Sequence, residues 1–179
     1  ESTELKAVLE KVLPQVAKKS KMPILECVLL ESKNNILTAT ATDIDTYLSV
    51  DTGKYYNNTD GKVLIHSDDI KLINKLSGEL EVISNNDEVT FKTGKKTISV
   101  KNHDVTMFPE TIDNINRVDF TPILAIKENV FTTAITKSSY FVSCDEQNNV
   151  MMQYYNLNVK QGRMEALDGH RVSMIDIEI

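Results

Sequence analysis

Asp168, His170 and Arg171 crowd together near the end of the chain, and this combination could serve acid–base or phosphate chemistry. A general base needs a reacting proton within hydrogen-bonding reach and usually a group that orients it. The same stretch offers no nucleophile with a partnered base. Asp168-Gly169 is also typical of a tight turn, in which Asp bonds its own backbone and Gly supplies a positive φ angle. The sequence favours the turn. An enzyme that uses Asp168 and His170 is kept as an alternative, behind the two functions given at the end of this subsection.

Other residues that could carry chemistry are isolated along the chain. His66 and His103 have no second ligand at metal-site spacing, so we expect no metal. The six glycines are scattered singly and form no phosphate-binding loop, and no cofactor is expected. Cys27 and Cys144 lie far apart in apolar settings, which predicts two core residues rather than a disulfide or a zinc site.

The elements that must position these residues follow an internal repeat. Residues 33–43 return in altered form as residues 160–171, and in both copies a strand, a polar turn and a second strand end in Ala-x-Asp. Each copy follows an amphipathic helical segment, and a further such helix lies between the copies. This pattern predicts a small helix-and-strands unit that is used about three times.

Helical spacing of apolar residues predicts three helices, over residues 4–18, 67–76 and 127–137, with Ser67 capping the second. Pro14 should kink the first helix or end it early. Strands are expected over residues 22–31, 36–42, 62–65, 79–84, 88–92, 97–101 and 118–124, and from 47, 150 and 163 onward. Helices followed by antiparallel strands with short turns predict an α+β fold, and residues 108–117 read as an interdomain connector.

Composition limits the class of protein. The 179 residues, 41% of them hydrophobic, suffice for one complete domain and part of another. No apolar run approaches the roughly eighteen residues that cross a bilayer, and the start, Glu1-Ser2-Thr3-Glu4, lacks the features of a secretion signal. We therefore expect a soluble, cytoplasmic protein without membrane contacts.

The net charge of −6 is distributed unevenly along the chain. Residues 4–21 hold five lysines against two glutamates, residues 67–76 two lysines against two aspartates, and residues 127–137 two lysines against one glutamate. These helical regions therefore sum to +4, which leaves −10 for the rest of the chain. The pattern predicts mildly basic helices and acidic strands and loops, and three ordinary solvated helix faces are the alternative.

Several separated segments, in the same order, resemble the bacterial DNA polymerase III beta subunit, the beta sliding clamp. The most specific is Asp168-Gly169-His170-Arg171, which is similar to the Thr-Asp-Gly-His-Arg-Leu motif of the family's second domain. The other segments are residues 5–14, 23–25, 28–31, 37–43 and 70–76, Thr93-Gly94-Lys95, and Met107-Phe108-Pro109-Glu110.

The resemblance implies a DNA-clamp fold, with helices on one concave face and antiparallel sheets on the other. Residues 1–117 would form clamp domain I without its first strand, which Glu1-Ser2-Thr3 cannot supply. Residues 118–179 would form the first half of clamp domain II, so the chain is expected to be a fragment. The three helices are expected to share the concave face.

The resemblance also implies two binding sites. Duplex DNA would pass along the helices through weak, salt-dependent and sequence-independent contacts. The lysines expected to make them are Lys19 and Lys21, then Lys6, Lys11 and Lys75. A pocket would receive a short peptide motif from the replicative DNA polymerase subunit, the clamp loader and repair polymerases. Its wall would fall on Met152, Leu167, Gly169, His170, Arg171 and Val172.

Departures from the family pattern lie at that pocket. Leu167 stands where the family has Thr, Val172 where it has Leu, and Gln153-Tyr154 where it has Asn-Gly. These changes make one edge more apolar, which leaves peptide specificity open. The expected function is a non-enzymatic processivity factor that encircles DNA and self-associates into a ring when full length. The alternative is a diverged clamp-like adaptor that binds protein partners without encircling DNA.

Overall fold

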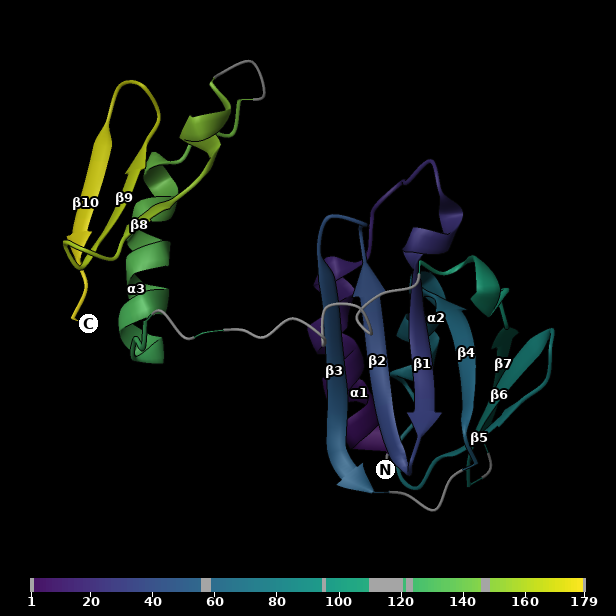
Figure 1. The fold of residues 1–179 in the computed structure, drawn as a ribbon. Helices are drawn as coiled ribbons and strands as arrows, with labels where there is room; N and C mark the ends of the chain where they lie inside the picture. Colours follow the sequence, from purple (N-terminus) through teal and green to yellow (C-terminus); the bar gives the residue numbers. More distant parts are fainter. Residues whose placement is uncertain are drawn as a thin grey trace. The chain divides into compact units, whose positions relative to one another are not determined.

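The computed structural model describes residues 2–55, 59–94, 96–109, 121, 124–145 and 149–178. The chain divides into two compact units, Glu1–Val118 and Asp119–Ile179, and each is described by itself (Figure 1). Most of the expected connector 108–117 and of the expected strand 118–124 lies outside the described residues.

The first unit contains two antiparallel sheets and two helices. The larger sheet has the order β3-β2-β1-β4, from strands Cys27–Lys33 (β1), Ile36–Thr42 (β2), Tyr47–Tyr55 (β3) and Gly61–His66 (β4). The smaller has the order β5-β6-β7, from Glu81–Ser84, Glu88–Thr93 and Lys96–Lys101. The helices are α1, Ser2–Val12, and α2, Ser67–Ile73. These elements confirm the α+β class.

Both helices pack on the same face of the larger sheet. Val28 and Leu30 of β1 belong to the buried cluster that contains the apolar stripes of α1 and α2. Leu29, between them, belongs to a separate cluster with Phe108 on the other face, as strand alternation requires. In Figure 1 both helices lie behind this sheet. For the first unit, the prediction of helices on one side is confirmed.

Pro14 ends the first helix early, as expected. The α-helix stops at Val12, and Leu13–Gln15 continue as a 3-10 turn (η1) with Pro in its first positions, because Pro cannot donate the next helical hydrogen bond. Polar turns also form where the sequence places them. Asn34 and Asn35 have φ angles of 51° and 64° between β1 and β2, the left-handed pair that a two-residue hairpin loop needs.

Several elements differ from expectation. The strand expected from Met22 begins only at Cys27, because Pro23–Glu26 form a 3-10 turn (η2). The second helix ends at Ile73 rather than Leu76, and its cap is His66 rather than Ser67. In the second unit, Val150–Gln153 form a 3-10 turn (η6) and not the expected strand, with Asn149 as the capping residue.

The second unit repeats part of the first. Helix α3, Glu128–Ser138, continues as a 3-10 turn, Ser139–Phe141 (η5), and precedes a sheet of order β10-β9-β8. Its strands are Asn156–Asn158 (β8), Arg163–Leu167 (β9) and Val172–Asp176 (β10). Ala134, Met164 and Ile177 form its buried core. The order helix, 3-10 turn and antiparallel meander matches α1 to β3, which confirms the internal repeat.

The repeat extends to hydrogen bonds. Asp43 follows β2, and its carboxylate accepts from the backbone N–H of Thr46 at 2.8 Å. Asp168 follows β9, and its carboxylate accepts from the backbone N–H of Arg171, also at 2.8 Å. In both units an aspartate therefore closes the turn after the middle strand of the meander.

Candidate functional site

The positive charge of the first helical region lies after the helix and not on it. Within α1, two lysines oppose two glutamates, so the helix itself is neutral. Residues 17–22, here called the basic loop, hold Lys18, Lys19 and Lys21 without a carboxylate, and all three side chains are exposed. The expectation of a basic first helix was wrong, because it counted residues beyond the end that Pro14 imposes.

The other helices follow the same rule. Helix α2 contains two aspartates and one lysine, Lys71, whose ammonium lies 2.9 Å from the Asp68 carboxylate. Lys75 is exposed just beyond this helix. Helix α3 carries one glutamate and one lysine. The helices themselves therefore have no excess of lysine over acidic residues. The unbalanced lysines of the first unit's helical regions, Lys18, Lys19, Lys21 and Lys75, lie beyond the helix ends.

The structure places all five predicted DNA-contacting lysines in the first unit. Lys11, Lys19, Lys21 and Lys75 are exposed, whereas Lys6 is half-buried beside the core residue Leu5. Among the residues that the structure describes, none of these five lysines forms an ion pair. Their charges are therefore available to an outside anion.

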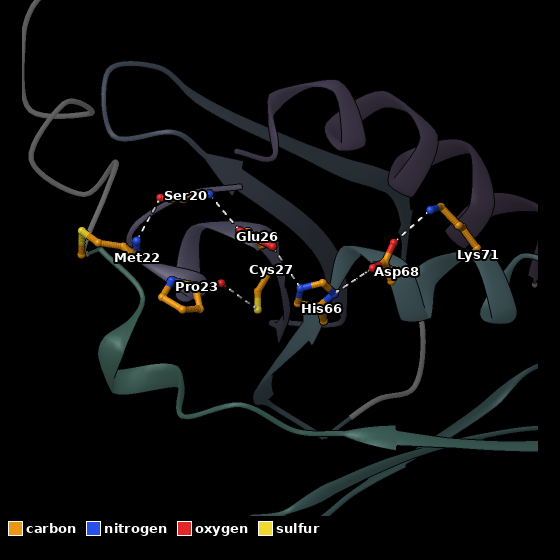
Figure 2. Close-up of polar contacts among 8 residues, drawn as sticks. All are labelled: Ser20, Met22, Pro23, Glu26, Cys27, His66, Asp68 and Lys71. Atoms are coloured by element: carbon orange, nitrogen blue, oxygen red, sulfur yellow. Dashed lines mark hydrogen bonds and ion pairs between the residues drawn. The ribbon is translucent and has the colours of Figure 1, made fainter. Parts of the chain in front are cut away.

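A network of hydrogen bonds fixes the backbone of the basic loop. Ala17 N–H donates to the Leu25 carbonyl at 3.1 Å, and Ser20 N–H donates to Glu26 Oε1 at 2.9 Å (Figure 2). Met22 N–H donates to the Ser20 hydroxyl at 3.1 Å. Lys19 has a φ of 55°, a left-handed conformation that residues other than Gly rarely adopt. The loop therefore holds one defined shape.

His66 links this network to α2, and sequence reasoning missed it. Its Nδ1 accepts from the backbone N–H of Asp68 at 3.2 Å, and its Nε2 lies 3.4 Å from Glu26 Oε2. The His103 ring lies 6.3 Å from the His66 ring, centroid to centroid. Burial and the Lys101 charge lower the pKa of His103. A histidine just before Ser67-Asp68 was the available signal, because N-cap positions favour side chains that accept hydrogen bonds.

In the second unit, Asp168 organises the turn between β9 and β10. Its Oδ1 accepts from the backbone N–H groups of His170 and Arg171 at 3.0 and 2.8 Å. Its Oδ2 accepts from Nε and an Nη of Arg171 at 3.0 and 2.6 Å. The Arg171 hydrogen bonds, followed by those of the two backbone amides, lower the pKa of Asp168 from 3.8 to about 2. Gly169 has a φ of 89°, and the predicted tight turn is confirmed.

The predicted wall residues of the peptide pocket meet around this turn. A Cβ at Gly169 would lie 3.5 Å from Met152 Sδ, so Met152 packs on the turn although it comes from η6 and not from a strand. The Arg171 guanidinium carbon lies 5.5 Å from the centre of the Phe141 ring. Leu167 and Val172 pair across the hairpin and are 42% and 57% exposed.

The arrangement does not assemble an acid–base pair from Asp168 and His170. The carboxylate is occupied by Arg171 and the turn amides, and among the described residues His170 hydrogen-bonds only through its backbone N–H. Within the described ranges, no group of three potential ligands could hold a metal ion.

Of the two cysteines, Cys27 is buried as predicted, whereas Cys144 is exposed, so its assignment to the core was wrong. No helix in the described part of the chain could span a membrane.

Comparisons with solved structures identify the fold. Caulobacter crescentus pol III beta superposes with a TM-score of 0.83 at 21% identity, covering 100% of this chain and 49% of that chain. The DnaN sliding clamp of Bartonella birtlesii, solved bound to griselimycin, gives 0.82 at 17%, covering 100% and 49%. The sliding clamp of Bacillus subtilis gives 0.78 at 16%, covering 100% and 50%. This chain thus spans about half the length of these clamps.

The sequence comparison agrees with the fold. No curated protein matches the chain. A family model, however, matches residues 1–113 and describes the N-terminal domain of the DNA polymerase III beta subunit. These residues include α1, the basic loop and both sheets of the first unit, and they make up more than half of the chain. The chain therefore belongs to the DNA polymerase III beta subunit family.

Proposed function

We propose that this chain is part of a non-enzymatic sliding clamp that encircles duplex DNA without reading its sequence. Residues 1–117 are assigned to clamp domain I and residues 118–179 to the first half of clamp domain II. The observation that carries the proposal is the basic loop, which has three exposed lysines that form no ion pair with any residue the structure describes. Such charges attract phosphates independently of base sequence.

The proposed contacts are few, which suits a protein that slides. Each neutralised phosphate releases counterions, so affinity falls with salt, and a handful of lysines gives only weak binding at physiological salt. Enclosure by a ring then retains the DNA. In this proposal, self-association of the complete protein forms the ring.

The turn at Asp168 is proposed as the second-domain wall of a peptide dock. Met152, Leu167, Gly169, His170, Arg171 and Val172 lie on or beside it. A dock of this kind tethers the replicative DNA polymerase subunit, the clamp loader and repair polymerases through a short peptide motif. A clamp that serves these partners would act in the cytoplasm.

The test is retention on DNA of defined topology. The complete protein, loaded on closed circular duplex DNA, should remain bound in a gel-filtration column at 0.5 M NaCl and should be lost after one restriction cut. A nicked circle, which keeps the ring threaded, should retain it and serves as the control. Equal loss from circular and linear DNA would refute encirclement.

A protein-binding adaptor that does not enclose DNA is the second candidate. The exposed apolar side chains of the second unit favour it, because Met151, Tyr154, Leu167 and Val172 all reach solvent and exposed apolar groups often mark protein-binding surfaces. Peptide binding without any topological retention would select this candidate.

A further inference from the structure

Glu26 is a carboxylate beside the basic loop, where its charge should weaken attraction for phosphates. It lies at the end of η2, and its side chain is 26% exposed. Its two oxygens have different partners, because Oε1 accepts from Ser20 N–H at 2.9 Å and Oε2 lies 3.4 Å from His66 Nε2 (Figure 2). Because the negative charge of Glu26 should disfavour phosphate binding at the loop, we expect a structural role for its carboxylate.

The first partner lies at the centre of the basic loop. Ser20 stands between Lys19 and Lys21, so an anchored Ser20 amide fixes the backbone on both sides at once. The left-handed conformation of Lys19 also requires a fixed backbone, because this conformation costs free energy and persists only where other contacts hold it. The Glu26 hydrogen bond is such a contact, and bonds to a charged acceptor are among the stronger ones.

The second partner fixes Glu26 itself. His66 Nδ1 accepts the Asp68 N–H, so in the neutral imidazole the proton resides on Nε2, which faces Glu26. His66 ends β4 and caps α2. The Glu26 carboxylate is thereby held between the basic loop and the junction of β4 with α2.

We propose that Glu26 is a positioning residue for DNA binding: it holds the Ser20 amide and thereby presents Lys19 and Lys21 in one orientation, while His66 anchors Glu26 to α2. The inference rests on the proposed function, because it assumes that these lysines contact DNA. A preorganised loop loses less conformational entropy when it binds. This gain opposes, and in our proposal exceeds, the repulsion between the carboxylate and DNA.

Three substitutions distinguish the effect of the hydrogen bond between residue 26 and Ser20 from the effect of the negative charge of Glu26. Glu26→Gln removes the charge and replaces the oxygen facing His66 by an NH2 group, but it keeps an oxygen that can accept from Ser20 N–H. Glu26→Ala removes both, and Glu26→Asp keeps the charge but withdraws the oxygen by one methylene. Glu31→Ala is the matched control, because Glu31 also forms a partly exposed ion pair, with Lys62 at 3.2 Å, but in the described part of the chain it makes no hydrogen bond or ion pair with the loop.

The experiment measures affinity of the complete protein for a short duplex, together with hydrogen exchange of the Ser20 amide. We expect Glu26→Gln to bind at least as tightly as wild type, and Glu26→Ala and Glu26→Asp to bind about threefold or more weakly. In these two variants Ser20 should exchange on the order of tenfold faster. A Glu26→Ala protein that binds as tightly as Glu26→Gln would show that the residue acts only as a charge, which overturns the proposal.

Parallel lysine variants distinguish the two levels of the argument. Lys19→Ala and Lys21→Ala should each reduce the salt dependence of binding. If they do not, the proposed DNA contact is wrong whatever Glu26 does. If they do, and Glu26→Ala and Glu26→Asp bind like Glu31→Ala, only the positioning role fails. Thermal unfolding of every variant excludes misfolding, and Glu26→Asp keeps the test valid if Glu26→Ala does not fold.

Discussion

Lys19 offers a substitution that should strengthen the fold and weaken DNA binding at the same time. Its φ of 55° lies in the left-handed region, and its side chain is exposed and forms no ion pair with any described residue. A side chain in this conformation costs about 1–2 kcal/mol, whereas glycine adopts it freely. Glycine also raises the entropy of the unfolded chain, which costs about 0.5–1 kcal/mol. We therefore expect Lys19→Gly to raise the free energy of unfolding by up to about 1.5 kcal/mol.

The same substitution removes one phosphate contact. The slope of log affinity against log salt should become about 0.9 less steep, so the affinity lost between 50 and 200 mM salt shrinks by about 3.5-fold. Urea denaturation of this chain measures the first effect. Fluorescence anisotropy of a labelled duplex, titrated with the complete protein at several salt concentrations, measures the second.

Lys19→Ala is the control that separates the two effects. Alanine removes the same charge but keeps a Cβ, so the slope should change as in Lys19→Gly while stability should not rise. If Lys19→Gly lowers stability, the left-handed conformation is not the one that the folded protein holds. If stability rises and the salt slope stays at its wild-type value, Lys19 does not contact DNA.

Three further predictions concern other residues. Because the pKa of Asp168 is lowered from 3.8 to about 2, its carboxylate contributes stability that is present above pH 4 and is lost as the pH falls toward 2; acid titration followed by circular dichroism should show a smaller loss in Asp168→Asn. Maleimide should label Cys144 alone in the native chain and both cysteines in urea, because Cys27 is buried with its pKa raised to about 11; two native adducts by mass spectrometry would contradict this. Ser32→Ala should raise the unfolding free energy measured by urea denaturation by up to about 1 kcal/mol, because Ser32 Oγ is buried and has no hydrogen-bond partner among the described residues; a loss of stability would show that the hydroxyl is satisfied in solution.

Features set by neighbouring residues could be predicted from the sequence. The apolar stripe of α1, the Asn34-Asn35 hairpin turn and the Asp168-Gly169 turn each depend on a few consecutive residues with strong conformational preferences. The helix stop at Pro14 is of the same kind. These elements follow from backbone sterics and local hydrogen bonds, and distant parts of the chain do not alter them.

Features set by a competing local structure could not be predicted so well. The apolar residues after Met22 and after Asn149 suit strands, but both segments form 3-10 turns, and neither turn could be recognised from alternation of apolar residues. The error in the charge of the first helix has another cause. The count ran to Lys21, past the end that Pro14 imposes, so the region looked basic, whereas the helix that ends at Val12 is neutral.

The contact between the distant residues Glu26 and His66 could not be predicted from the sequence. Glu26 and His66 are 40 positions apart, and only the pairing of β1 with β4 brings them together. His66 therefore looked isolated. Met152 is a distant contact that the family resemblance did predict. The resemblance placed Met152 beside Gly169, and the structure brings the two together. The element that carries Met152 is a 3-10 turn, however, and not the expected strand.

The structure gives the family departures at the proposed dock a physical meaning. Leu167 and Val172 are directly opposite each other in the β9–β10 hairpin, so their side chains share one face of the sheet and both reach solvent. Where the family has Thr and Leu, this chain presents two adjacent apolar side chains. Burying a threonine hydroxyl requires a hydrogen bond, whereas an apolar pair gains only from contact with apolar groups.

The turn next to this pair is already rigid. Asp168 bonds Arg171 through both the backbone and the guanidinium, and Arg171 also lies against Phe141. Little conformational entropy should therefore be lost when a ligand binds, and discrimination between ligands should fall on the apolar edge. A peptide that places an aliphatic or aromatic side chain against Leu167 and Val172 should be preferred over one that offers a polar group there. The fixed turn would serve every partner alike, and the two substituted positions would decide among them.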